Sequence, residues 1–202
     1  ANDIITSDGS GTFTYNGIAA SAIDSGTIAT ARLGSGTASS STVLYGDQTY
    51  KAEPGGANTP AFEAYLGDSM LSIADNTWTK VEFDTEVFDT DGDYDNSTNY
   101  RFTPQTAGKY CCYADVYGTD YFGIMNVFAL KFHFNGAQYQ TSSTFKQDYR
   151  NNPGNTAMVT LVQTIDFDGS SDYLEVYCLI STGTSPDIGQ NSAFGAYKLI
   201  GA

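Results

Sequence analysis

Positive charge is scarce in this sequence. Its 202 residues include 9 Lys and Arg against 23 Asp and Glu, which gives a formal net charge of −14 at pH 7. A chain with this charge is repelled by nucleic-acid phosphates and by anionic membrane surfaces. The composition therefore argues against nucleic-acid binding, and it is typical of a protein that stays soluble at high local concentration.

Long apolar runs are also missing. No stretch reaches the roughly 18 consecutive apolar residues of a membrane-spanning helix, so we expect no membrane insertion. The first residues lack the basic region and apolar run of a secretory signal peptide. The chain starts at Ala1 rather than at Met, so either the initiator was removed or the chain is part of a longer polypeptide.

Cysteine is limited to Cys111, Cys112 and Cys178. Adjacent residues on a strand point to opposite faces, so Cys111 and Cys112 are poorly placed to pair with each other. The spacing also lacks the Cys-x-x-Cys pattern of zinc sites. We expect buried free thiols in a reducing cytoplasm. A bridge from Cys178 to one of the other two stays open if their strands are neighbours.

Motifs for catalysis are few. His133 is the single His, and neither a Gly-x-Ser-x-Gly nucleophile motif nor a Gly-rich phosphate loop followed by Lys occurs. We expect His133 to lie in solvent or at an interface, on the face of its strand opposite a row of Phe residues. Glycosidases use a pair of carboxylates, but the spacing of the 23 Asp and Glu residues does not point to any particular pair. The sequence predicts a protein that is not an enzyme.

Aromatic and small residues are abundant by contrast. With 15 Tyr, 12 Phe and 21 Gly, the composition favours half-buried strands joined by tight turns. Asn135-Gly136 predicts a hairpin. The predicted strands cover residues 60–65, 78–83, 100–103, 109–117, 127–134, 137–140, 158–167, 173–180 and 193–200. Short strands without a helical period predict an all-β sandwich or jelly roll.

The first part of the chain, residues 1–57, differs from residues 58–202. It is rich in Gly, Ser, Thr and Ala, and Ser-Gly-Thr occurs three times. By itself such a segment buries too little apolar surface to fold. Single aliphatic residues nevertheless recur through it: Ile18, Ile23, Ile28, Leu33, Val43 and Leu44. We therefore expect an extended stalk in which three chains intertwine, and we prefer this hypothesis to a flexible linker. The Pro- and Gly-rich residues 53–60 form the boundary with the rest of the chain.

Short motifs after residue 60 occur in an order that resembles the C1q-like branch of the tumour-necrosis-factor (TNF) superfamily. They are Ala61-Phe62, Val81-Glu82-Phe83-Asp84, Gly92-Asp93-Tyr94-Asp95, Phe102-Thr103-Pro104, Ala107-Gly108-Lys109-Tyr110, Asp172-Tyr173-Leu174-Glu175-Val176 and Ser192-Ala193-Phe194-Gly195-Ala196-Tyr197-Lys198-Leu199. The sequence departs from many members at Asn99-Tyr100-Arg101 and at Gly195, directly after Phe194. The resemblance implies a two-sheet jelly-roll head that forms a homotrimer.

Residues 26–50 resemble recurrent segments of bacteriophage fibre proteins. Those segments often end in Gly-Asp-Gly-Thr-Trp, where this chain has Gln48 and Tyr50 in place of the second Gly and the Trp. The resemblance implies a virion fibre or spike, made in the bacterial cytoplasm and located on the virion surface. Its stalk would dock on another virion protein, and its head would attach to a host glycan or protein. A capsid-mounted head fibre or decoration protein with a mainly structural role is the alternative.

The most metal-like run of the chain is a set of alternating aspartates: Asp89, Asp91, Asp93 and Asp95. Their carboxylates could converge on Ca²⁺ in a loop. The run departs from the helix-flanked calcium loop, since the twelfth position from Asp89 is Tyr100 rather than Glu. The C1q-like resemblance instead assigns Gly92, Tyr94 and Asp95 to a structural turn. Calcium binding and a structural turn are thus competing hypotheses, and no other cofactor is expected.

Aromatic residues exceed what one core needs. We expect some of them to line subunit contacts, where amphipathic rings are favoured, and others to stack on a sugar at an exposed tip. The set is Tyr113, Tyr117, Tyr121, Phe122, Tyr139, Tyr149, Tyr173 and Tyr177.

Overall fold

The computed structural model describes residues 5–7, 10, 13–15, 33–52, 58–70, 72–140, 144–148 and 154–200. Within these ranges the chain is all-β, and no helix there is long and apolar enough to cross a membrane. The chain divides into two compact units, Ala1–Pro54 and Gly55–Ala202, which we call the stalk and the head. The predicted boundary after residue 57 borders residues 53–57, which lie outside the described ranges, and it stays a prediction.

The described parts of the stalk form two antiparallel hairpins: β1 (Ile5–Ser7) with β2 (Phe13–Tyr15), and β3 (Thr42–Leu44) with β4 (Tyr50–Ala52). Asp47 organises the turn after β3. Its carboxylate accepts hydrogen bonds from Lys51 Nζ at 2.5 Å and from the Thr49 N–H at 3.1 Å. The Lys51 bond, followed by those from Thr49, lowers the pKa of Asp47 to about 2.

The aliphatic residues of the stalk are exposed wherever they are described. Leu33, Val43 and Leu44 are all open to solvent in a single copy. The remaining members of the predicted series lie outside the described residues: Ile18, Ile23 and Ile28. The described stalk therefore has hairpins but no apolar core of its own.

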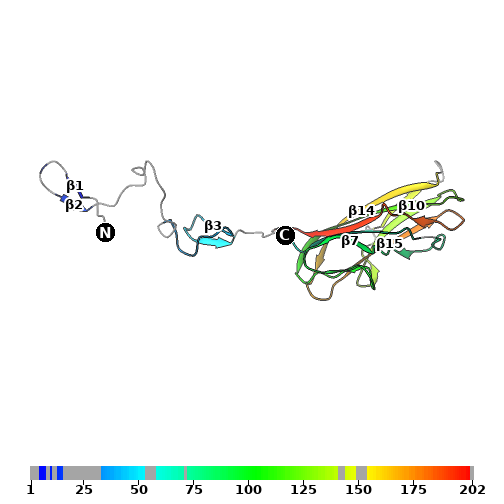
Figure 1. Ribbon diagram of the computed structural model, residues 1–202, viewed down its shortest axis with the longest axis horizontal. Helices are drawn as coiled ribbons and strands as arrows, with labels where there is room; N and C mark the ends of the chain where they lie inside the picture. The colour runs from blue at the N-terminus through cyan, green and yellow to red at the C-terminus, as the bar shows by residue number, and fades with distance from the viewer. Residues whose placement is uncertain are drawn as a thin grey trace. The chain divides into compact units, whose positions relative to one another are not determined.

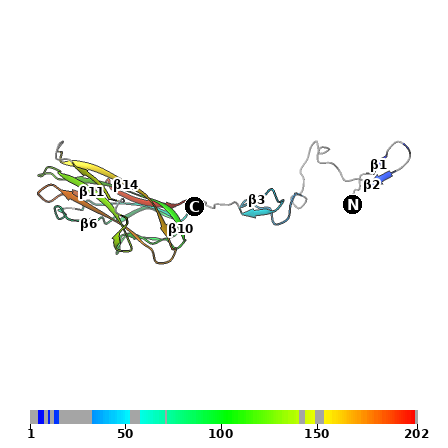
Figure 2. The ribbon, with the colours of Figure 1, turned by 180° about the vertical axis from the view of Figure 1, so that it is seen from behind.

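The described head is a sandwich of two antiparallel sheets, which Figures 1 and 2 show from opposite sides. Sheet I has the order β14-β10-β17-β5-β7, and β16 also pairs with β10. Its strands are β5 (Ala61–Tyr65), β7 (Thr85–Asp89), β10 (Gly108–Thr119), β14 (Thr156–Phe167), β16 (Asp187–Ile188) and β17 (Ala193–Lys198).

Sheet II has the order β12-β11-β15-β9-β8. In addition, β13 pairs with Val127–Lys131 of β11, on the same edge as β12, and β6 pairs with β15. Its strands are β6 (Thr79–Lys80), β8 (Tyr94–Asp95), β9 (Arg101–Phe102), β11 (Val127–Phe134), β12 (Ala137–Gln138), β13 (Thr144–Asp148) and β15 (Leu174–Ser181).

The core lies between the sheets because the strands alternate buried and outward residues. Along β10 every second residue from Tyr110 to Gly118 is buried. At the centre, the Phe62 ring stacks on Tyr94 and Phe102 with centroids 4.6 Å and 4.5 Å away, and it meets Phe194 edge to face at 5.0 Å. Burying an aromatic side chain of this kind contributes about 1.5–3 kcal/mol.

Most predicted strands are confirmed, with one shift. Residues 127–134 form β11, and the predicted Phe row lies on its core face. The predicted strand at residues 78–83 is paired as β6 only at Thr79–Lys80. The next strand, β7, was not predicted, since Val87 and Phe88 are adjacent rather than alternating. Val87 has no register partner on β5, because the register shifts between Glu63 and Ala64. This shift lets the side chains of Val87 and Phe88 both be exposed.

The two ends of the head carry different parts of the chain. At one end the Lys198 N–H donates to the Pro60 carbonyl at 3.1 Å, so the chain enters and leaves the sandwich at the same end. We call this the proximal end. β10 begins at this end with Gly108 and finishes at Thr119, which is opposite Asp187. At 3.3 Å per residue the strand covers roughly 36 Å. The loops after β10 and β15 therefore lie at the opposite, distal end.

All three cysteines are free. Cys178 lies on β15 in sheet II, whereas Cys111 and Cys112 lie on β10 in sheet I, so their strands are not neighbours within one sheet. The bridge that the sequence left open is therefore not formed. Burial raises the pKa of Cys178 to about 12 and that of Cys112 well above its ordinary value. Both remain protonated thiols at neutral pH.

Candidate functional site

Asp89 closes the loop that joins β7 to β8. Its Oδ1 accepts hydrogen bonds from the N–H groups of Asp91 at 3.2 Å and Gly92 at 3.0 Å, and its Oδ2 accepts one from the Tyr94 N–H at 2.8 Å. Gly92 has a φ of 74°, in the left-handed region that favours glycine. The structural turn implied by the C1q-like resemblance is thus present.

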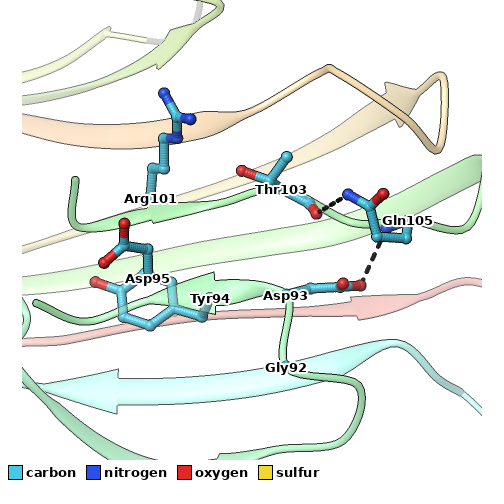
Figure 3. A pocket seen from close by; sticks show the side chains of 7 residues that line it. All are labelled: Gly92, Asp93, Tyr94, Asp95, Arg101, Thr103 and Gln105. Carbon is cyan, nitrogen blue, oxygen red and sulfur yellow. Dashed lines mark hydrogen bonds between the residues drawn. The ribbon is translucent and has the colours of Figure 1, made fainter. Parts of the chain in front are cut away.

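The next carboxylates also accept hydrogen bonds from main-chain amides. Asp93 Oδ2 accepts the Gln105 N–H at 3.1 Å (Figure 3), and burial raises the pKa of Asp93 in spite of this bond. Asp95 accepts N–H groups from Thr98 at 2.9 Å and Asn99 at 3.2 Å. The Thr98 bond is the main reason that the pKa of Asp95 lies well below its ordinary value. Asp95 is therefore an ionised cap of its turn.

A surface pocket of about 360 Å³ lies beside this loop, and Figure 3 shows its lining: Gly92, Asp93, Tyr94, Asp95, Arg101, Thr103 and Gln105. Two of the four predicted calcium ligands, Asp89 and Asp91, do not line it. Among the described residues no group of three or more His, Cys, Asp and Glu side chains is placed to hold a metal ion. The structure supports the turn, and calcium binding by the four aspartates stays a prediction.

A larger pocket, of about 550 Å³, lies at the distal end of the head. We call it the distal pocket; it is lined by Ser72, Asp120, Tyr121, Phe122, Thr184, Ser185 and Asp187. Tyr121 and Phe122 are 84% and 88% exposed, and their rings meet edge to face with centroids 5.0 Å apart. The lining comes from the connections β5–β6 and β10–β11 and from the loop that leads into β16.

Asp120 fixes the shape of the distal pocket. Its buried carboxylate accepts N–H groups of Phe122 at 2.9 Å and Gly123 at 2.7 Å through Oδ1, and it accepts the Thr184 hydroxyl through Oδ2. Burial acts to raise the pKa of Asp120, but hydrogen bonds, first that from Thr182 and then those from Thr184, Gly123 and Phe122, outweigh it and the pKa is lowered. A Cβ on Gly123 would lie 2.4 Å from Thr184 Oγ1. The loop is therefore tightly packed beneath two exposed rings.

The side of sheet I that faces away from the core, its outer face, is rich in apolar and aromatic residues. On it Tyr113 is paired with Val162, and Tyr117 with Met158, across β10 and β14. Neighbouring strands add three more rings: Tyr65, Phe88 and Tyr197. Val162 and Met158 are both more than half exposed. An apolar surface spread over several strands marks a contact with another molecule.

The outer face of sheet II carries basic side chains stacked on rings. Lys131 Nζ lies 4.1 Å from the centroid of the Trp78 ring, and the His133 ring stacks on Tyr177 at 4.0 Å. His133 lies opposite the Phe row, as predicted, but it is half-buried. Its Nε2 is buried and has no hydrogen-bond partner among the described residues. Burial, and then the charge of Lys131, lowers the pKa of His133.

The aromatic residues singled out in the sequence fall mostly on these surfaces. Tyr113 and Tyr117 lie on the outer face of sheet I, and Tyr121 and Phe122 line the distal pocket. Tyr173 and Tyr177 lie on the outer side of sheet II. Tyr139 packs against the core instead, and Tyr149 lies outside the described residues. The polar lining of the distal pocket was missed, because Ser72 and Asp187 are 115 residues apart and no local motif joins them.

Comparison with known proteins identifies the fold. No family model and no curated protein matches the sequence. Among solved structures, murine APRIL at pH 8.5 is similar with a TM-score of 0.48 and 11% identity, and murine APRIL at pH 5.0 with a TM-score of 0.50 and 10% identity. Each comparison covers 69% of this chain and 98% of that one. APRIL is a TNF-family protein. The likeness with a TM-score of 0.50, together with the two-sheet sandwich, shows a jelly-roll fold of the TNF type, as the sequence motifs implied.

Proposed function

We propose that this chain is the fibre or spike protein of a bacteriophage virion, a homotrimer that attaches the particle to its host. The observation that carries the proposal is the difference between the two ends of the head. The chain joins it at the proximal end, while Tyr121 and Phe122, its most exposed described rings, lie at the distal end. A fibre tip that must reach a cell surface has this arrangement. The phage-fibre resemblance of residues 26–50 supports the virion context.

Trimer formation is supported by the outer face of sheet I. A single copy leaves residues such as Met158, Val162 and Tyr197 exposed. Identical subunits with closed symmetry can cover such a surface with one another. The C1q-like resemblance of residues 60–202 points to the same assembly. Three heads on one fibre would convert weak individual contacts into strong overall attachment.

The stalk fits the same assembly. Leu33, Val43 and Leu44 have no apolar core to enter in one copy, and small residues around them let several chains approach closely. We infer that three stalks pack these residues together and that their N-terminal part docks on another virion protein. The acidic charge of −14 suits a surface protein present in many copies and opposes nucleic-acid binding.

We further propose a binding role rather than a catalytic one. His133, the single His of the chain, is stacked on Tyr177 in sheet II and lies in neither of the pockets described. Release of sugars from host envelopes by the purified protein would overturn this part of the proposal.

The proposal is tested on the virus itself. Labelled antibody against the head is expected to mark the tail, and free protein is expected to compete with virions for adsorption to host cells. Antibody on the capsid, together with no competition, would replace attachment with the structural role of a head fibre or decoration protein. A monomeric mass in native mass spectrometry would overturn the trimer.

A further inference from the structure

The distal pocket combines aromatic rings with polar groups, and we propose that it binds a neutral saccharide. Tyr121 and Phe122 would stack on sugar rings, while Asp187 and Ser185 would bond their hydroxyl groups. This inference rests on the proposed function, because it names the ligand class and the site through which the head would attach. The experiment below distinguishes failure of the saccharide site from failure of the proposed attachment function.

The rings are held out of the core by a built loop. Asp120 binds the N–H groups of Phe122 and Gly123 from below, and its own N–H donates to the Asn155 carbonyl at 2.8 Å. The Tyr121 and Phe122 rings stand at 82° to each other. Two perpendicular aromatic surfaces can therefore meet two faces of one ligand. Large apolar side chains kept this exposed mark a binding surface.

The polar wall offers acceptors for hydroxyl groups. Asp187 uses Oδ1 to accept the Ser72 N–H at 2.7 Å, and this bond orients its carboxylate. Ser72 holds a left-handed conformation, with a φ of 55°, in presenting that N–H. The Thr184 hydroxyl donates to Asp120 and lies 3.3 Å from the Thr182 hydroxyl, so these bonds fix its orientation in the wall. Hydrogen bonds from sugar hydroxyls to a carboxylate are charge-assisted and short.

Charge decides which saccharides fit. The lining contains two carboxylates, Asp120 and Asp187, and no Lys, Arg or His. Hydrogen bonds hold Asp120 in its ionised form. Sialylated, sulfated or phosphorylated sugars would be repelled here, and by the net charge of the whole chain as well. Neutral hexoses and amino sugars with acetylated nitrogen bring hydroxyl donors and apolar C–H faces without that repulsion.

Size and position agree with this ligand. A volume of about 550 Å³ lies within the usual range of about 300–1,000 Å³ for small-molecule sites, which allows a short oligosaccharide. The pocket opens at the end of the head opposite Pro60, where the chain enters. A glycan projecting from a surface would reach this end first.

The test uses the full-length protein on a printed array that carries neutral oligosaccharides beside sialylated, sulfated and phosphorylated ones. We expect binding to neutral members only. The double variant Tyr121→Ala with Phe122→Ala should lose at least tenfold in affinity, and Asp187→Asn should lose several-fold. Ile200→Ala, an exposed apolar residue near the proximal end, is the matched control and should bind as the wild type does. Unchanged Tm and native mass show that the variants fold and assemble.

Several outcomes overturn the saccharide site: binding kept by the double variant, binding only of anionic glycans, or no glycan binding at all. Choline is included as a probe because a quaternary ammonium ion also suits rings beside carboxylates; choline binding without any sugar binding overturns the assignment. If wild type and double variant both block virion adsorption, attachment stands and the site falls. If the wild type binds neutral sugars but does not block adsorption, the site stands and attachment falls.

Discussion

The Tyr113 hydroxyl donates a 2.7 Å hydrogen bond to Glu63 Oε2 across strand β17. The ring can cross because Gly195 lies beneath it: a Cβ there would be 2.4 Å from the Tyr113 Cζ and hydroxyl oxygen. Burial and then the bond to Glu63 raise the pKa of Tyr113, so the phenol stays protonated. One glycine thus sets how an aromatic ring lies on the outer face of sheet I.

Gly195→Ala tests this arrangement. The added methyl group would push the Tyr113 ring away from Glu63 and roughen the surface through which we propose the head trimerises. We expect the trimer dissociation constant to rise at least tenfold in analytical ultracentrifugation. Gly46→Ala is the control, since a Cβ at Gly46 meets no atom within 4 Å. A Gly195→Ala trimer as tight as the wild type would show that sheet I is not the contact surface.

Tyr113→Phe separates the ring from its hydrogen bond. The ring remains over Gly195, while the Glu63 carboxylate loses its donor. We expect a loss of about 1–2 kcal/mol in the free energy of unfolding, the usual cost of removing one partner of a partly buried hydrogen bond to a charged group. Chemical denaturation measures it. No loss would mean that water replaces the phenol at no cost.

Asp89→Ala should destabilise the head. It leaves three main-chain N–H groups without their acceptor, and we expect a loss of about 1–3 kcal/mol. Asp91→Ala is the matched control, because the Asp91 carboxylate is exposed and accepts only the Thr90 hydroxyl among the described bonds; it should change stability by less than about 0.5 kcal/mol. Equal losses in the two variants would contradict the capping role of Asp89.

Calcium binding can be measured on the same loop. If the four aspartates hold Ca²⁺, the ion raises the Tm of the wild type and EDTA reverses the increase. The increase should disappear in Asp93→Asn combined with Asp95→Asn, whose side chains line the loop pocket. An unchanged Tm across the millimolar range of calcium would leave the turn as the sole role of this run.

His133 should make the head less stable in mild acid. Its pKa is lowered in the fold, first by burial and then by Lys131, with Glu175 acting in the opposite direction. Below its ordinary value near 6.5 the unfolded chain therefore binds the proton more readily than the native one. Stability is full above that pH and falls as the pH drops through the folded pKa. We expect the free energy of unfolding to decrease from pH 7 to pH 5.

His133→Gln isolates this effect. Gln is neutral throughout, so the difference in unfolding free energy between variant and wild type should change with pH over that window. His133 is the single His, so no other imidazole titrates over this window. Lys131, Glu175 and Tyr177, which face it, are present in both proteins. Parallel pH profiles would show that the His133 pKa is unchanged on folding.

Buried thiols should resist alkylation. Cys112 and Cys178 are fully buried, and burial raises the pKa of each. Because the thiolate is the reactive form, iodoacetamide at pH 7.5 should leave both unmodified in the native protein and modify both after denaturation. Peptide mass spectrometry identifies the sites. Rapid native labelling of Cys178 would contradict the packing of β15 against the core.

The sequence by itself determined the all-β class, the strands with clear alternation and the TNF-type order of motifs, because side-chain periodicity is a local property of a strand. Residues 109–117 illustrate this, since burial of every second residue from Tyr110 follows from the pleat. Strand β7 could not be predicted in this way. Its Val87-Phe88 pair breaks the alternation, and only the bulged register against β5 makes it a strand.

Only the tertiary structure brought together the residues of the two surfaces to which we assign a role in our proposals. The outer face of sheet I joins Tyr113 to Glu63, and the distal pocket joins Tyr121 to Asp187 and Ser72; each set comes from strands or loops far apart in the chain. Periodicity tells which face a residue takes but not which neighbour it meets. That depends on sheet order and on loop ends brought together by the sandwich. The aspartate run at residues 89–95 shows the same limit, because the sequence pattern did not show that Asp89, Asp93 and Asp95 each accept hydrogen bonds from main-chain N–H groups.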